Sequence, residues 1–62
     1  MYIVKDYYTN GHVGLHVLNL SIFNIKQRFD KLMKIRNGLK YEIYETTQKT
    51  LQADWKELNV HH

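Results

Sequence analysis

Alternating apolar and polar positions open the chain and predict a β-hairpin. Residues 2–8 and 13–20 are rich in β-branched and aromatic side chains, as strands prefer. Between them, Asn10-Gly11 is the strongest short hairpin signal, because both residues accept a positive φ in a two-residue type I′ turn. The register that follows pairs Tyr8 with Val13, Asp6 with Leu15 and Val4 with Val17 on one face, and Tyr7 with Gly14, Lys5 with His16 and Ile3 with Leu18 on the other.

Asp6 does not suit this register. The better core face is the one that carries Val4, Tyr8, Val13, Leu15 and Val17, yet Asp6 lies on it as well. A carboxylate that is buried without a partner is costly. Either Asp6 lies at an open edge, or the two strands pair in a different register.

A helical period follows between residues 21 and 37. The apolar positions fall within one stripe at the 3.6-residue repeat, namely Ile22, Ile25, Phe29, Leu32, Met33 and Ile35. Ser21 is placed to cap the N-terminus, and Asn24 is a competing cap one turn later. Asn37-Gly38 ends the helix, with the glycine supplying the left-handed conformation. We therefore predict one amphipathic helix that packs against the hairpin.

The last third of the chain returns to strand-like alternation and then becomes ambiguous. Residues 39–44 alternate with a period of two and predict a third strand, and residues 46–49 form a polar turn. In residues 50–58, Leu51 and Trp55 fit both a strand alternation and a helical stripe that continues to Leu58. We favour a strand, which would close a second hairpin.

The pattern as a whole predicts the α+β class, in one domain over residues 1–62. An antiparallel sheet carries one helix on one face, in the order β-β-α-β-β, and the alternative order is β-β-α-β-α. A chain of this length buries only about 60% of its unfolded surface, so its stability as a monomer is small. The absence of cysteine excludes disulfides and thiolate zinc sites. Tight helix-on-sheet packing or oligomerisation must therefore supply the remaining stability.

The sequence contains few signals of cellular location. No apolar run approaches the roughly 18–20 residues of a membrane span, and the first residues lack the pattern of a signal peptide. We therefore expect a soluble, cytoplasmic protein. His61-His62 has the sequence of a purification-tag remnant, and we assign it no natural function.

Positive charge is concentrated on the predicted helix. Residues 21–37 hold five cations and one acid, a local charge of +4 within a chain whose net charge is +3. A helix of this length spreads its cations over roughly 20 Å, enough to follow several phosphates. The residues directed at a nucleic-acid backbone or an acidic protein surface are Lys26, Arg28, Lys31 and Lys34. A helix face that only keeps the protein in solution has the same pattern.

The helix-free face of the predicted sheet is the second candidate surface. Tyr7 and Tyr44 fall on it beside Lys5 and Lys40, where aromatic rings can stack on unpaired bases. Apolar residues on the same face favour a protein partner or a homodimer. The predicted interface residues are Ile3, Tyr7, Leu18 and Tyr44.

No enzyme chemistry emerges from the remaining residues. His12 and His16 would lie about 13 Å apart on a strand, too far to share a metal ion. We find no catalytic motif, metal site or cofactor site, and we expect a protein that is not an enzyme and takes no small-molecule substrate. Two functions compete: a weak nucleic-acid binder acting through the helix, and a protein-binding module or inhibitor, of the kind phages and mobile elements encode, acting through the sheet face and strand edges.

Overall fold

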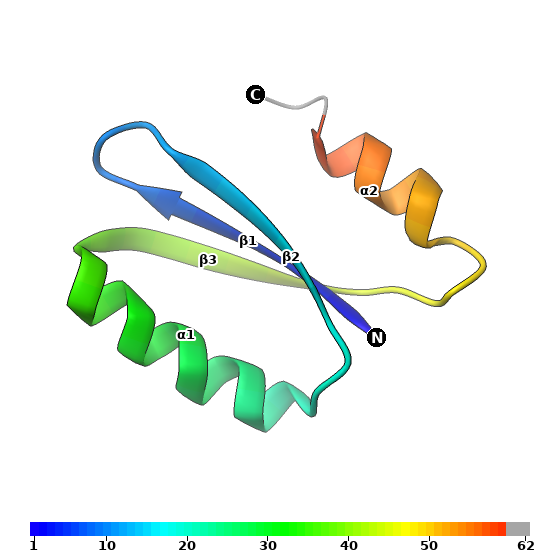
Figure 1. Cartoon of the computed structure of the whole chain (residues 1–62), viewed down its shortest axis with the longest axis horizontal. Helices are drawn as coiled ribbons and strands as arrows, with labels where there is room; N and C mark the ends of the chain where they lie inside the picture. Colours follow the sequence, from blue (N-terminus) through cyan, green and yellow to red (C-terminus); the bar gives the residue numbers. More distant parts are fainter. Residues whose placement is uncertain (60–62) are drawn as a thin grey trace.

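The computed structural model describes residues 1–59 and shows a three-stranded antiparallel sheet with two helices (Figure 1). The elements are, in chain order, β1 (Tyr2–Tyr8), β2 (Val13–Leu18), α1 (Ile22–Arg36), β3 (Gly38–Glu45) and α2 (Leu51–Asn59). β1 is the central strand, in the order β2-β1-β3. The predicted α+β class with an antiparallel sheet is thus confirmed. The suggested tag remnant, His61-His62, lies outside the described residues.

The two helices lie on opposite sides of the sheet (Figure 1). On one side, Val4 of β1 forms the buried core with Ile25 and Phe29 of α1. On the other side, Lys5 Nζ donates to the main-chain oxygen of Leu58 in α2 at 3.1 Å. Val4 and Lys5 are consecutive in a strand, so their side chains point to opposite faces. The even-numbered residues of β1 therefore face α1, and the odd-numbered residues face α2.

The hairpin between β1 and β2 has a three-residue loop, so the predicted two-residue turn is wrong. Gly11 N–H donates to the Tyr8 oxygen at 3.1 Å, and Tyr8 N–H donates to the His12 oxygen at 3.0 Å. A type I′ turn needs a positive φ at both central residues, but in this loop only Gly11 has one, at 86°. The Asn10 side chain instead accepts a bond from the His12 N–H at 2.9 Å. This is the pattern of a turn followed by a glycine bulge.

The longer loop shifts the register of the hairpin by one residue. Asp6 lies opposite Gly14 rather than Leu15, and Ile3 lies opposite Val17 rather than Leu18. A shift of one residue moves every side chain of β2 to the other face of the sheet. His16 therefore faces α1, and Leu15 faces α2.

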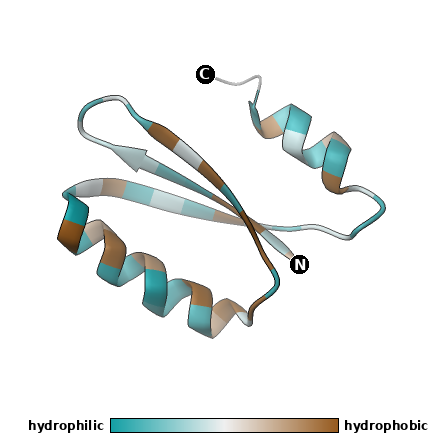
Figure 2. Cartoon of the chain, in the orientation of Figure 1, coloured by the Kyte–Doolittle hydropathy of each residue, from teal (hydrophilic) through white to brown (hydrophobic). Residues whose placement is uncertain are grey.

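Helix α1 begins as predicted and buries less of its apolar stripe than expected. Ser21 is the N-cap and accepts from the Asn24 N–H at 3.2 Å, so the competing cap at Asn24 is not used. Ile22 and Ile35 remain 44% and 69% exposed at the two ends, because a helix of about 22 Å extends past the patch where it meets the sheet. Figure 2 shows hydrophobic and hydrophilic positions interleaved along α1. At the C-terminus Asn37, not Gly38, takes the left-handed conformation.

The final segment is a helix, so the favoured order β-β-α-β-β is wrong; the structure has β-β-α-β-α. Its start is held by threonines: the Thr47 hydroxyl accepts from the Thr50 N–H at 3.4 Å, and the Thr46 hydroxyl donates to the Asp54 carboxylate at 2.6 Å. The helical stripe of Leu51, Trp55 and Leu58 is partly buried. Neither α1 nor α2 is a long enough apolar helix to cross a membrane.

Candidate nucleic-acid interface

The exposed cations of α1 form the main candidate site, which we call the α1 basic surface and define as Lys26, Arg28, Lys31 and Lys34. All four residues are exposed. Within residues 1–59, Lys40 pairs with Glu42 and His16 contacts Asp6, and no ion pair involves the α1 basic surface. These charges are therefore available to an external anion.

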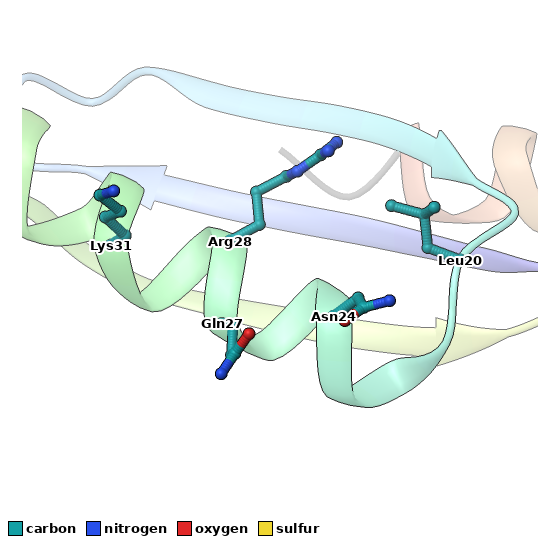
Figure 3. A pocket seen from close by; sticks show the side chains of 5 residues that line it. All are labelled: Leu20, Asn24, Gln27, Arg28 and Lys31. Atoms are coloured by element: carbon teal, nitrogen blue, oxygen red, sulfur yellow. The ribbon is translucent and has the colours of Figure 1, made fainter.

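The α1 basic surface has two sides. Arg28 and Lys31 line an open depression together with Leu20, Asn24 and Gln27. Figure 3 shows Arg28 extending from α1 towards β2, whereas Gln27 points away from the sheet. A second depression, beside β3, is lined by Lys34 of α1 and by Leu39, Lys40 and Tyr41 of β3. The Lys40 amine itself lies over the Tyr7 ring, on the side of α2, so it adds no charge to the α1 basic surface.

Asp30, the only acid of α1, is held at the β3 side of the helix. Its carboxylate accepts the Tyr41 hydroxyl at 2.6 Å, and this bond is the main reason that the pKa of Tyr41 is raised to about 12. The Tyr41 ring in turn packs at 5.7 Å from the ring of Phe29. The side of α1 that carries Arg28 and Lys31 is therefore left without an acid from the helix.

Phe23 is a feature that the sequence analysis missed. Its side chain is 66% exposed in the first turn of α1. It precedes Lys26 and Gln27 by three and four residues, which places it on the same side of the helix. Its position outside the apolar stripe was the signal in the sequence that could have predicted this exposure. An exposed aromatic ring next to cations can stack on an unpaired base.

The predicted interface residues do not form one exposed apolar face. Ile3 is fully buried on the side of α2, and Leu18 lies opposite Tyr2 and packs against the core on the side of α1. The expectation that they project together from a helix-free face is wrong for two reasons. The register differs by one residue, and α2 lies against that face.

Tyr7 and Tyr44 do lie on one face, with their hydroxyls turned to Glu42. Both donate to the same carboxylate oxygen, at 2.7 Å and 3.0 Å. These bonds lower the pKa of Glu42, and the bond to Glu42 is the main cause that raises the pKa of Tyr7 to about 12. The amines of Lys5 and Lys40 lie 5.6 Å and 4.9 Å from the centre of the Tyr7 ring. Both tyrosine hydroxyls therefore donate their hydrogen bonds within the protein rather than to a partner.

Asp6 is the buried centre of a polar cluster on the side of α1. Its side chain is 2% exposed and accepts the Tyr8 hydroxyl at 2.5 Å and His16 Nε2 at 3.0 Å. The bond to Asp6 is also the main cause that raises the pKa of Tyr8. The His16 ring packs edge-on against Phe29 at 5.3 Å. The residue that did not suit the predicted register is thus buried with partners.

His12 and His16 both contact neighbours within the hairpin. Among residues 1–59, no group of three or more histidine or carboxylate side chains could hold a metal ion. His16 is engaged by Asp6, whereas the exposed His12 lies 5.7 Å from the Tyr8 ring.

We expect the tyrosines held by carboxylates to titrate unusually late. The fold raises the pKa of Tyr7 and Tyr41 from 10.0 to about 12, so the folded protein holds these protons more tightly than the unfolded chain. Their contribution to stability is complete below about pH 10 and is lost as the pH rises towards 12. Asp30→Asn should lower the pKa of Tyr41 and leave Tyr7 unchanged, as measured by NMR of the ring carbons. An unchanged Tyr41 titration in Asp30→Asn would contradict the assignment.

No family model, curated protein or solved structure matches this chain.

Proposed function

We propose that the protein binds the phosphate backbone of nucleic acids through the α1 basic surface. The observation that carries the proposal is the set of four exposed cations on one helix, none of them in an ion pair within residues 1–59. Phosphate contacts of this kind fix a protein on a strand but read no sequence. The protein is therefore a non-enzymatic accessory binder of low sequence specificity.

Two further features support nucleic acid as the partner. Tyr41 holds Asp30 by a hydrogen bond at the β3 side, which leaves the Arg28 and Lys31 side without an acid from α1. Phe23 adds an exposed aromatic ring at one end of the same surface. An aromatic ring beside a row of cations suits single strands, where a base can stack while its phosphates are neutralised.

The number of phosphate contacts predicts how steeply the affinity falls as the salt concentration rises. Four phosphate contacts correspond to a slope of log K against log salt of about −3.6 on duplex DNA and about −2.8 on single strands. Fluorescence anisotropy with labelled duplex DNA and single-stranded RNA, between about 50 and 200 mM salt, measures this slope. Failure to bind either probe at about 50 mM salt would refute the proposal.

A matched pair of charge reversals locates the surface. Lys31→Glu/Lys34→Glu reverses two exposed cations of α1, and Lys49→Glu/Lys56→Glu reverses two exposed cations near or on α2, with the same change in net charge. We expect the α1 variant to lose at least about tenfold in affinity and to show a shallower slope by roughly two contacts. The control should lose less than about threefold. Equal losses would show that only net charge matters and that α1 is not the site.

A further inference from the structure

The sheet has two free edges, and they differ. In the order β2-β1-β3, the outer sides of β2 and β3 pair with no strand within residues 1–59. An unpaired edge offers a row of N–H and C=O groups to any other strand, so proteins usually protect it with charges, proline or a bulge. The two edges of this sheet can be compared for those devices.

β3 carries such devices and β2 does not. Lys40, Glu42 and Glu45 place charges along β3, and its pairing with β1 is irregular near Tyr8. β2 is Val-Gly-Leu-His-Val-Leu, with neither a lysine, arginine, acid nor proline, and its register with β1 is regular. Figure 2 shows β2 largely in the hydrophobic colour. β2 is therefore the edge that is open to pairing.

The hairpin determines which groups of β2 face outwards. Tyr8 and His12 form a hydrogen-bonded pair at the loop, and in an antiparallel ladder such pairs alternate. The N–H and C=O groups of Gly14 and His16 consequently point to β1. Those of Val13, Leu15 and Val17 point away from the sheet. Their side chains lie on the side of α2, where Val17 is 40% exposed and lines a depression with Leu51 and Trp55.

We propose that β2 pairs antiparallel with β2 of a second copy of this chain, with Leu15 on the two-fold axis. Two copies of a three-stranded sheet then form one continuous sheet of six strands. Val13 lies opposite Val17 of the second copy, and the outward N–H and C=O groups of both strands are satisfied. The axis is perpendicular to the sheet, because residues opposite each other in a ladder share a face.

The chemistry of β2 favours a second copy over an unrelated strand. The row Val13, Leu15 and Val17 is apolar and self-complementary about its centre, and it carries no charge that would repel a copy or select a different partner. The depression beside Val17, lined by Leu51 and Trp55 together with Gln52 and Lys56, places two apolar side chains next to the position of Val13 of the second copy. An interface formed by one strand is small, so we expect dissociation on the order of 10 µM.

The geometry of the dimer has a further consequence for α1. A two-fold axis perpendicular to the sheet leaves both α1 helices on the same side of the six strands. Two α1 basic surfaces would then face the same way, which extends the electrostatic footprint of the protein. Dimerisation itself does not depend on nucleic acid, so the proposed function and the dimer can fail independently.

Single cysteines test the register in a chain that has none of its own. With Leu15 on the axis, the two Leu15 Cα atoms lie about 5.5 Å apart, within disulfide reach. Mild oxidation of Leu15→Cys should therefore yield a covalent dimer. Val17→Cys and Leu39→Cys, the latter exposed on β3, should remain mostly monomeric under the same conditions. A dimer that forms through Val17→Cys or Leu39→Cys instead would overturn the register.

Sedimentation velocity without nucleic acid tests the association itself. The unmodified protein should pass from monomer to dimer between about 1 and 500 µM. Val17→Lys should raise the dissociation constant roughly tenfold or more, because it places a charge on the unpaired edge. Leu39→Lys makes the same change on the edge of β3 and should leave the constant within about twofold. A monomer throughout the range, or equal effects of the two variants, would overturn the proposal.

Discussion

Asp6→Ala is expected to lower the free energy of unfolding by about 1–3 kcal/mol, because the buried Tyr8 hydroxyl loses its acceptor inside the protein. The Tyr8 hydroxyl and His16 Nε2 both bond to the Asp6 carboxylate, whose side chain is 2% exposed, but the His16 side chain is 40% exposed and can bond to water instead. Each donor that is left unsatisfied in a buried place costs about 1–3 kcal/mol. A domain of this size has only about 3–9 kcal/mol of stability in total. Urea denaturation, followed by circular dichroism, measures the change.

The matched control is Asp30→Ala, which also removes a carboxylate that accepts a tyrosine hydroxyl. Asp30 is exposed on α1, and Tyr41 can bond to water once the carboxylate has gone. We therefore expect a loss below about 1 kcal/mol. Asp6→Asn keeps one acceptor oxygen and should fall between the two. If Asp6→Ala is no more destabilising than Asp30→Ala, the cluster does not hold β1, β2 and α1 together.

Helix α1 shows how far the sequence could predict the fold. Its start at Ser21 depends on local chemistry, because a serine hydroxyl caps a nearby N–H and the apolar period begins at once. Its exposed cations were predictable for the same reason, since residues off the apolar stripe face solvent. The exposure of Ile35 was not predictable, because it depends on where the sheet stops beneath the helix.

The register of the hairpin shows where local reasoning failed. Asn10-Gly11 fits two loops, one of two residues and one of three, and the choice between them changes the face of every side chain in β2. The misfit of Asp6 was the evidence against the shorter loop. With the longer loop, Asp6 comes opposite Gly14 and reaches His16, so that the same residue is buried with partners.

Part of the candidate site was predictable from the helix alone, and part depends on a second element. The four cations of α1 follow from the helical period, but the bond from Tyr41 to Asp30 joins residues of two elements. Such contacts depend on how β3 returns beside α1. The helical state of α2 was not predictable for the same reason. Leu51, Trp55 and Leu58 fit either a strand or a helix, and the surface of the sheet favours the helical stripe.

Gly14→Ala is expected to destabilise the protein by about 1–3 kcal/mol, through overpacking against the same carboxylate. A Cβ atom at Gly14 would lie well inside van der Waals contact with Asp6 Oδ1 and 3.1 Å from His16 Nε2. The Asp6 carboxylate cannot turn away without losing its bond to His16. Thermal and urea unfolding measure the loss.

The decisive comparison is the same substitution in a chain that already carries Asp6→Ala. With the carboxylate gone, the added methyl group fills vacated space, and alanine is favoured over glycine within a strand by about 0.5–1 kcal/mol. Gly14→Ala should then be neutral or stabilising, which gives a coupling energy of roughly 2 kcal/mol between the two sites. Gly11→Ala is the control, because Gly11 has a φ of 86° with no atom within 4 Å of an added Cβ. The loss of stability in Gly11→Ala comes from the backbone alone. It should therefore be the same in the unmodified chain and in the chain that carries Asp6→Ala. If Gly14→Ala also costs the same in both backgrounds, the glycine is needed for its backbone and not for the space that Asp6 occupies.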